Sequence, residues 1–233
     1  MSHSRKKIVV LSGAGISAES GLGTFRDSGG LWEKYDISKV ATIEAWHENP
    51  TLVLEFYDAR RKQIIDAKPN IAHFSLVELE KQYDVTIVTQ NIDDLHERSG
   101  SSTVLHLHGE ILKSRSEATD AITYPISGDI KYGDLAPDGQ QLRPHIVWFG
   151  EDVPKLTEAQ EIIKKCDILI IVGTSLNVYP AAGLRFACPE TAKKHLIDPN
   201  AVLLDDKSYT HWRGTASEQI PLLVKEFLSA PVS

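Results

Sequence analysis

The sequence has few cysteines and no long apolar run. Its two cysteines, Cys166 and Cys188, lie far apart and form no C-x-x-C pair. Their spacing therefore offers neither a zinc knuckle nor a disulfide framework, and it fits a reduced compartment. No apolar stretch approaches the roughly 18 residues of a membrane span. The opening MSHSRKKIVVLSGAG has too short an apolar segment for a signal peptide and lacks a cleavage pattern. We expect a cytoplasmic protein that is not bound to a membrane.

Basic charge is also scarce. The 233 residues carry 25 Lys and Arg against 32 Asp and Glu, a net charge of -7. A net-negative chain is a poor general binder of polyanions, so we expect no specific nucleic-acid partner. With 42% hydrophobic residues, the chain is long enough for one large domain, or for one domain with a small insert. The sequence shows no repeat or coiled-coil pattern, and we expect a monomer.

Short apolar runs alternate with helical patterns along the chain. This alternation predicts an α/β fold with a Rossmann-like parallel sheet and helices on both faces. Helices are expected over 31–66, with a break at Asn49-Pro50, and over 70–82, 157–166 and 218–229. Strands are expected in KKIVVLSGAG, DVTIVTQN, TVLHLHGE, HIVWFGE, DILIIVGTS and KKHLIDPN. The polar, turn-rich segment 111–143 is the least regular part of the chain.

Four of these strands end in small or polar residues. GAG follows Ser12, TQNID follows Val88, HLHGE ends the strand of Val104, and GTS follows Val172. Open parallel sheets bind ligands at the carboxyl ends of their strands. The sequence therefore predicts a ligand site where these four segments meet.

The first segment, GAGISAESGLGTFRDSGGLW, runs from Gly13 to Trp32. Gly13 and Gly15 would let the backbone approach a pyrophosphate at the N-terminus of the following helix. The spacing is not G-x-G-x-x-G, and a glycine turn after a strand can also be purely structural. The polar and aromatic residues farther along the string favour a ligand loop, because an ordinary turn does not need them.

TQNID places two amides and a carboxylate at a strand end. Gln90 and Asn91 can bond ribose hydroxyls, and Asp93 can accept a hydrogen bond from a carboxamide. The alternative is a capping turn, since Asp is a good N-cap for the helix that contains LHERSG. Both interpretations stay open on the sequence alone.

His106 and His108 alternate along the third expected strand, so both are expected on one face. His108, just before Gly109 at the strand end, is well placed for general-base chemistry near neutral pH. A metal-binding histidine pair is the competing interpretation, but no third ligand lies at close spacing. A histidine such as His106 is more often structural.

GTSLNVYPAAG, from Gly173 to Gly183, repeats the arrangement of strand, small polar residues and helix. Thr174 and Ser175 suit contacts to ribose or phosphate. Asp198 could bind a hydroxyl of an adenosine ribose, as acidic residues do in dinucleotide folds. It could equally end its strand in an Asp-Pro turn.

Taken in order, these motifs resemble those of the sirtuins, the NAD-dependent protein lysine deacylases. GAGISAESGLGTFRD and GTSLNVYPAAG resemble NAD loops, TQNID a second signature, HGE the catalytic-histidine signature and VWFGE the substrate strand. Gly23 stands where proline is common in that family. The resemblance implies one catalytic domain over 1–233. Its Rossmann-like core would cover about 5–30, 84–110 and 144–233, and a small module about 31–83 (helical) and 111–143 (hairpin).

The resemblance also implies residue roles. NAD would be a consumed co-substrate, and nicotinamide, free lysine and O-acyl-ADP-ribose would be the products. His108 and Asn91 would be catalytic, with His108 as general base. Acyl-lysine would enter as an extended strand against Val147, Trp148, Phe149, Gly150 and Val178. The NAD-binding residues would be Gly13, Ala14, Gly15, Ser17, Ala18, Phe25, Arg26, Trp32, Gln90, Asn91, Ile92, Asp93, Gly173, Thr174, Ser175, Asp198 and Ala216.

Tyr57 and Arg60 in FYDARR match the Tyr-x-x-Arg pair of a sirtuin class that handles acidic acyl groups. At i, i+3 they share a helix face, where the guanidinium offers a planar fork to a carboxylate. A charge-assisted hydrogen bond contributes on the order of 1.5–3 kcal/mol, so we expect succinyl- and malonyl-lysine to be preferred to acetyl-lysine. Alternatively, Arg60 snorkels or pairs with a buried carboxylate. Asp58 falls on the opposite, polar side of this helix.

The chain departs from the family between HGE and VWFGE, where two cysteine pairs usually hold structural zinc. This interval contains no cysteine; Ser116 falls near the first expected position and LAPDGQQLRPH replaces the second pair. We predict that no zinc is bound. The hairpin core in its place would come from Ile111, Leu112, Ile122, Tyr124, Ile126, Ile130, Tyr132 and Leu135.

Two other functions are compatible with such a chain. One is mono-ADP-ribosyl transfer, which the same NAD chemistry permits. The other is a catalytically weak protein that binds NAD or ADP-ribose. The presence of Asn91, Asp93 and His108 argues against the second.

Overall fold

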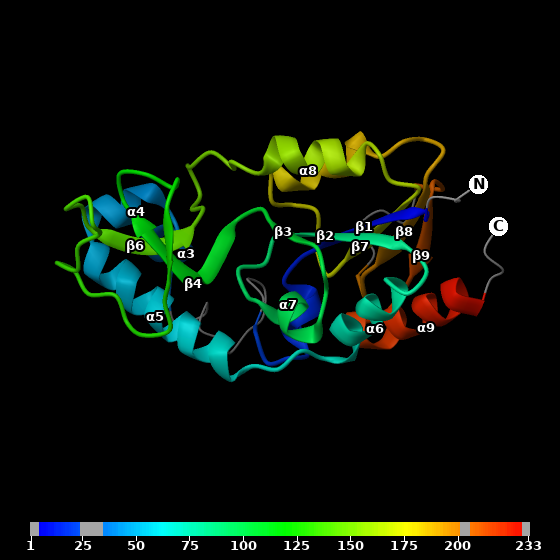
Figure 1. Ribbon diagram of the computed structural model, residues 1–233, viewed down its shortest axis with the longest axis horizontal. Helices are drawn as coiled ribbons and strands as arrows, with labels where there is room; N and C mark the ends of the chain where they lie inside the picture. The colour runs from blue at the N-terminus through cyan, green and yellow to red at the C-terminus, as the bar shows by residue number, and fades with distance from the viewer. Residues whose placement is uncertain (1–4, 24–34, 201–205, 230–233) are drawn as a thin grey trace.

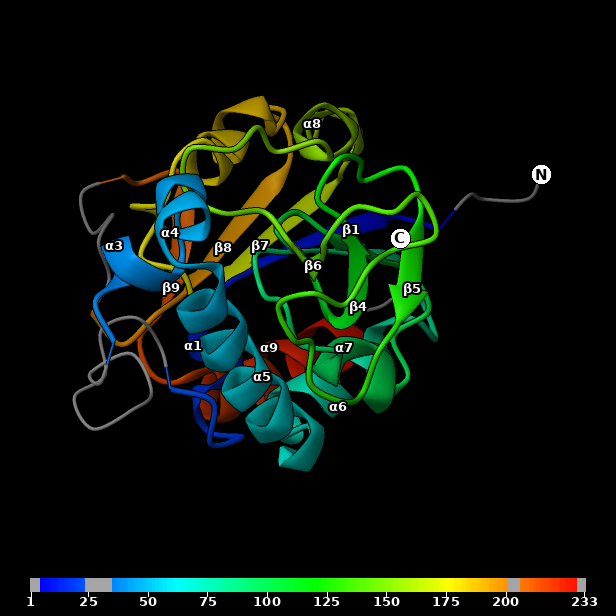
Figure 2. The ribbon, with the colours of Figure 1, turned by 90° about the vertical axis from the view of Figure 1, so that its left-hand side faces the viewer.

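Two sheets organise the computed structural model, which describes residues 5–23, 35–200 and 206–229. The larger has six parallel strands in the order β3-β2-β1-β7-β8-β9, and the smaller has three antiparallel strands in the order β5-β4-β6. Figure 1 shows the small sheet with α3, α4 and α5 at one end of an elongated molecule, and the large sheet with its helices at the other; Figure 2 faces the small-sheet end. The large-sheet strands are β1 (Lys7–Ser12), β2 (Asp84–Thr89), β3 (Val104–His106), β7 (Ile168–Val172), β8 (Lys193–Ile197) and β9 (Tyr209–Trp212). The small-sheet strands are β4 (Gly109–Ser116), β5 (Thr123–Pro125) and β6 (Leu142–Ile146). The helices are α1 (Gly15–Ala18), α3 (Ile37–Val40), α4 (Ile43–Glu48), α5 (Pro50–Asp66), α6 (Ile71–Leu79), α7 (Leu95–Ser99), α8 (Leu156–Ile163), the 3₁₀ helix η1 (Ala181–Ala187) and α9 (Ala216–Ser229).

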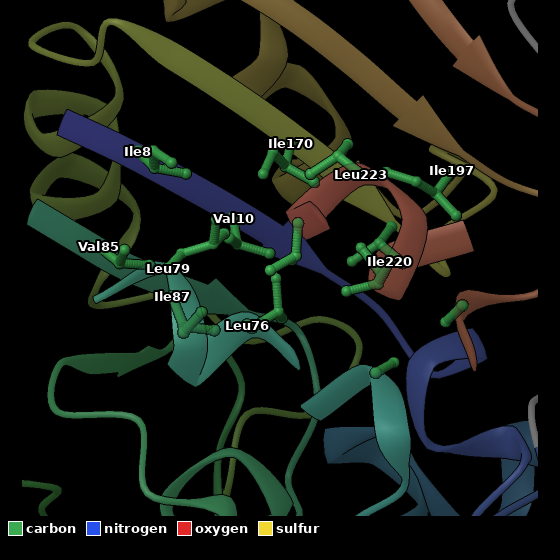
Figure 3. Close-up of a cluster of buried hydrophobic side chains, with 14 of the residues drawn as sticks. Ile8, Val10, Leu76, Leu79, Val85, Ile87, Ile170, Ile197, Ile220 and Leu223 are labelled. Carbon is green, nitrogen blue, oxygen red and sulfur yellow. The ribbon is translucent and has the colours of Figure 1, made fainter. Parts of the chain in front are cut away.

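Strand β1 shows why helices cover both faces of the large sheet. Its side chains alternate between the two faces, and both sets are buried and apolar. Ile8 and Val10 lie in the cluster of Figure 3, which packs β1, β2 and β7 against α6 and α9. Val9 and Leu11 lie in a second cluster with α8 and η1. A strand buried on both faces must be apolar throughout, so the predicted fold class is confirmed.

The strands of the large sheet end in one row. In the register, Thr89 pairs with His106 and with Ser12, Ser12 pairs with Val172, and Val172 pairs with Ile197. The loops that follow these residues therefore leave the sheet at the same edge. The predicted convergence of four segments at one edge is confirmed, and the sheet register is its cause.

The small sheet corrects two expectations. The segment expected to be least regular contributes most of this sheet, with an irregular register between Glu110 and Ser114. Strand β6 ends at Ile146, so the expected strand HIVWFGE was wrong after its first two residues. Beyond it, an isolated bridge joins Phe149 to Thr42. The segment that was expected to bind substrate is therefore a connection, not a strand.

The expected hairpin core was partly wrong. Ile111 and Ile130 are buried as predicted, but Ile122, Tyr132 and Leu135 are 59%, 66% and 60% exposed.

Helix α5 begins at the predicted break, where the Asn49 side chain accepts a hydrogen bond from the Leu52 N–H. The two cysteines are free, with their sulfurs 3.8 Å apart. Among the helices that the structure describes, none has the length and apolar character to cross a membrane.

Candidate functional site

The loops after β1 and β7 pack backbone against backbone. The N–H of Gly13 donates to the Val172 carbonyl at 3.0 Å, and the N–H of Gly15 donates to the Gly173 carbonyl at 2.8 Å. A Cβ at Gly15 would lie 2.7 Å from the Gly173 Cα, and one at Gly13 would lie 2.7 Å from the Thr174 Cβ. Only glycine permits this approach. The sequence attributed these glycines to contact with a pyrophosphate, and the structure adds that they bring two ligand loops together.

A buried polar cluster joins α1 to the loop after β2. The Asn91 Nδ2 donates to the Ser17 Oγ at 3.2 Å, and the Ser17 Oγ donates to the Asp93 Oδ2 at 3.1 Å. The other Asp93 oxygen accepts the N–H of Leu95 at 3.2 Å, at the start of α7. Burial raises the pKa of Asp93, and the hydrogen bonds from Leu95 and Ser17 oppose that shift. Asp93 thus accepts the hydrogen bond expected of a capping turn, and it also lies where a ligand residue was expected.

Gln90 connects this loop to the loop after β7. Its Nε2 donates to the Thr174 Oγ1 at 3.2 Å, and its backbone N–H donates to the Ser12 carbonyl at 2.9 Å. The Ile92 carbonyl accepts the N–H of Ile111 at 2.9 Å, which ties the same loop to β4. Ala14 and Ala18 lie at the two ends of α1, and the half-buried Ser175 follows Thr174.

The two residues expected at the adenosine end occupy ordinary structural positions. Asp198 follows β8, and its Oδ1 accepts the N–H of Asn200 at 2.7 Å, which is the strand-ending turn. Ala216 is the buried first residue of α9. The Glu19 carboxylate bonds the neighbouring Ser217 N–H at 3.0 Å. Three predicted NAD residues, Phe25, Arg26 and Trp32, lie outside the described residues.

The two histidines of HLHGE differ in their surroundings. β3 ends at His106 and β4 begins at Gly109, so the expectation that His106 and His108 lie on one strand was wrong. The His108 Nδ1 lies 3.0 Å from the Gln90 carbonyl oxygen. A carbonyl can only accept, so Nδ1 carries the proton and Nε2 is the basic nitrogen of the neutral ring. Burial lowers the pKa of His108, while the Gln90 carbonyl acts in the opposite direction.

Arg60 is a buried cation, with 7% of its surface exposed. Its Nη2 donates to the Gly23 carbonyl and its Nη1 to the Gln63 Oε1, both at 3.3 Å. Its Nε is buried without a hydrogen-bond partner, and within the described ranges the side chain forms no ion pair. Burial lowers the pKa of Arg60, while the charge of Asp93 acts the other way. Pairing with a buried carboxylate, the alternative considered for Arg60, is therefore not what these residues show.

Tyr57 lies one turn before Arg60 and contacts the expected substrate segment. It is 3% exposed, and its ring centroid lies 6.1 Å from that of Trp148. Burial raises the pKa of Tyr57, so its phenol is neutral. The neighbouring Val147 donates its N–H to the His108 carbonyl at 3.0 Å, and Phe149 donates its N–H to the Ala41 carbonyl at 3.0 Å. The predicted residues of α5 and of the substrate segment are thus brought together.

Comparison with known proteins assigns this arrangement to a family. Residues 13–180 match the profile described as the Sir2 family. The chain belongs to the Sir2 family. It is 57% identical over 196 residues to an NAD-dependent protein deacylase of Helicobacter pylori, with 84% of each chain covered. It is 50% identical over 233 residues to one of Bacteroides thetaiotaomicron, covering 97% of this chain and 100% of the relative.

Solved Sir2 structures agree with this assignment. A Sir2 homologue in complex with NAD aligns with a TM-score of 0.83 and 36% identity, covering 95% of this chain and 89% of that one. A Sir2 protein with a deacetylated p53 peptide and 3′-O-acetyl ADP-ribose aligns with a TM-score of 0.76 and 29% identity, covering 97% and 93%. This Sir2 chain is an NAD-dependent protein deacylase, and NAD is its co-substrate.

Two buried ion pairs of the Sir2 chain were missed on the sequence. Arg61, 1% exposed, lies 2.5 Å from Asp58, and Asp58 was expected on a polar face but is only 8% exposed. An Arg three residues after an Asp on a helix was the available signal. The second pair joins Arg143 to Glu151 at 2.7 Å, with the Arg143 guanidinium 3.4 Å from the Trp148 ring centroid. Arg143 and Glu151 meet only because the folded chain turns between them, so local sequence patterns contain no signal for this pair.

The metal prediction is untested by these observations. Within residues 5–23, 35–200 and 206–229, no three His, Cys, Asp or Glu side chains are grouped so as to hold a metal ion. The absence of bound zinc therefore stays a prediction for metal analysis.

Proposed function

We propose that this Sir2 enzyme removes succinyl and malonyl groups from lysine in preference to acetyl, and forms nicotinamide and O-acyl-ADP-ribose. Arg60 is the observation that carries this proposal, because its guanidinium is buried with an unpartnered Nε. An unpaired buried charge is costly, and the terminal carboxylate of an acidic acyl group would supply the missing partner. The neutral Tyr57 phenol, on the same face of α5, would donate a second bond to that carboxylate.

The residues at the strand ends fit NAD. We place the pyrophosphate of NAD beside the loops after β1 and β7, which Gly13, Gly15 and Gly173 allow to pack closely at the strand ends. The buried amide and carboxylate of Asn91 and Asp93 are suited to ribose and carboxamide groups. NAD, when bound, supplies a reactive bond between ribose and nicotinamide, and its ribose receives the acyl group. In our proposal Asn91 and Asp93 orient that end of NAD.

We assign the general base to His108. Its Nδ1–H is fixed by the Gln90 carbonyl, which leaves Nε2 to take a proton from a ribose hydroxyl. The lowered pKa of His108 keeps the ring neutral and ready to accept that proton near neutral pH.

The acyl-lysine substrate is proposed to lie as an extended strand between the segment 147–150 and the loop that carries Val178. Support comes from the first segment, which begins one residue beyond β6 with Val147 bonded to the His108 carbonyl. Trp148 in this segment contacts Tyr57. The lysine side chain would thus be directed toward both His108 and the α5 pair. This places the site between the Rossmann-like core and the small module, the division that we propose for the chain.

The test compares acyl groups on one peptide. Purified enzyme is incubated with NAD and matched acetyl-, succinyl- and malonyl-lysine peptides, and the products are weighed by mass spectrometry. Wild-type kcat/KM should favour the acidic groups by roughly one to two decades. Arg60→Met should erase the preference, because the buried charge is removed. Lys62→Met is the matched control on the same helix; its ammonium is exposed and pairs with Asp129, so it should keep the preference.

Four outcomes would contradict the proposal. Wild-type enzyme that prefers acetyl-lysine, or an Arg60→Met variant that keeps the succinyl advantage, would remove the assigned role of Arg60. An ADP-ribosylated peptide would identify a transferase instead. Unchanged peptide in the presence of bound NAD would identify a binding protein.

A further inference from the structure

His106 has no role in the mechanism above, yet it occupies a defined position beside the site. It is the last residue of β3, and its register partner is Thr89, where the TQNID loop leaves β2. Its side chain is 8% exposed. A buried polar side chain at this corner must satisfy both ring nitrogens within the protein.

Both nitrogens of His106 face acceptors. The Nδ1 lies 3.0 Å from the Asn91 carbonyl oxygen, and the Nε2 lies 2.7 Å from the Glu97 Oε1. A carbonyl and a carboxylate can only accept, and a neutral imidazole has one N–H. Only the imidazolium form can donate to both oxygens, so the two contacts together require a protonated ring.

The carbonyl that His106 bonds belongs to the loop that holds the reacting end of NAD in our proposal. The consecutive carbonyls of Gln90 and Asn91 are bonded by two imidazoles, those of His108 and His106 respectively. The Asn91 side chain continues this network to Ser17. The His106 ring therefore links the backbone of Asn91 to Glu97 on α7, whose side chain is 41% exposed.

The charges around His106 favour that proton. Burial alone would lower the pKa of His106, but the hydrogen bond and charge of Glu97, the Asn91 carbonyl and the charge of Glu110 outweigh it and raise the pKa. Glu97 belongs to α7 and Glu110 to β4, and Asp93 in the intervening loop also interacts with the ring. The cationic Lys113 on β4 lies near Glu97.

One more titratable ring, His96 on α7, interacts with His106. Burial holds the pKa of His96 well below its usual range, so it adds no positive charge that would disfavour the imidazolium.

We propose that His106 is a positioning residue for the NAD reaction, an imidazolium that holds the loop Gln90–Asp93 by donating to both Asn91 and Glu97. Loss of its proton leaves one of the two oxygens without a donor, which breaks the link between this loop and α7. His106 must be charged while His108 must be neutral, so the pH profile of kcat/KM for NAD should be bell-shaped, with His106 setting the alkaline limb. This inference rests on the roles proposed above for Asn91 and His108.

The kinetic test changes the partner of His106 and leaves the ring in place. Glu97→Gln removes the charge that favours the imidazolium, so the alkaline limb should move to lower pH by about one unit or more. The acid limb should stay in place, and KM for NAD should rise several-fold at pH 8 but not at pH 6. Glu78→Gln is the control, since this exposed carboxylate on α6 pairs with Lys81, which follows the helix. A Glu97→Gln profile that superimposes on wild type would overturn the proposal.

A second measurement does not depend on turnover. Long-range ¹H–¹⁵N NMR of the whole wild-type chain at pH 7 should show both ring nitrogens of His106 protonated, with the signal assigned by its loss in His106→Gln. A neutral ring at pH 7 would overturn the proposal whatever the kinetics show. If the enzyme proved to prefer acetyl-lysine, the function proposed above would fail, while the NMR result would still decide the state of His106.

Discussion

The buried ion pair between Asp58 and Arg61 should be a main stabilising contact of the small module. Arg61 donates through Nε to the Ile111 carbonyl at 3.0 Å and through Nη1 to the Gly128 carbonyl at 3.0 Å. Asp58 accepts the N–H of Ile130 through both oxygens at 3.2 Å. The pair therefore joins α5, the helix of Tyr57 and Arg60, to the segment 111–143.

The perturbation is Asp58→Asn, which leaves the Arg61 cation buried without a counter-charge. Breaking a buried pair in this way costs about 3–5 kcal/mol, or a fall in Tm of roughly 6–20 °C for a chain of this length. Urea unfolding and calorimetry measure both values. Asp58→Leu with Arg61→Met removes both charges and should recover much of the loss, since apolar replacement of a whole pair is often nearly neutral.

The control is an exposed pair that joins α5 to the residue before Ile130. Lys62 and Asp129 lie 2.9 Å apart with side chains 63% and 44% exposed, so Asp129→Asn should cost less than about 1 kcal/mol. If Asp58→Asn cost no more than Asp129→Asn, the buried pair would not be what fastens the module to α5.

Other consequences can be measured separately. Burial lowers the pKa of His73 from 6.5 to about 4, so its stabilising contribution is complete above pH 6.5 and is lost as the pH falls toward 4, a total of about 3 kcal/mol. The variant His73→Gln can keep the capping box and should make the midpoint of urea unfolding depend less on pH over that interval. An unchanged dependence of the midpoint on pH would contradict the assignment. Gly15→Ala should cost roughly 1–3 kcal/mol and weaken NAD binding in calorimetry, because its Cβ would lie 2.7 Å from the Gly173 Cα. Gly128→Ala, with nothing within 4 Å of the added Cβ, should do neither. Treatment with EDTA should leave Tm and activity unchanged, and elemental analysis that finds one zinc per chain would refute the zinc-free prediction.

Much of the large sheet and of the candidate site could be predicted from local patterns. The run ILIIV is buried throughout, as expected of a central parallel strand, and polar segments after such strands must gather at one edge. Arg60 was identified because a permanent cation on an apolar helix face is unusual.

The failures share a physical cause. Asp58 was assigned to a solvent-facing side, and the segment around Ile130, between β5 and β6, covers that side. Ile122, Tyr132 and Leu135 were assigned to a core because they are apolar, and the turns of the module leave them exposed. In both cases the environment is supplied by residues distant in sequence, which periodicity on one element does not reveal.

The order of most strands and helices, the glycine turns and the residue types gathered at the carboxyl edge could be predicted from the sequence, because these depend on neighbours along the chain. Which polar groups meet became clear only in the folded chain. His106 bonds both Asn91 and Glu97, Arg60 remains without a carboxylate in the described chain, and Arg61 bonds the Ile111 carbonyl. These pairings follow from sheet register and from the packing of one element on another, so their charges and proton positions could be assigned only after the chain was folded.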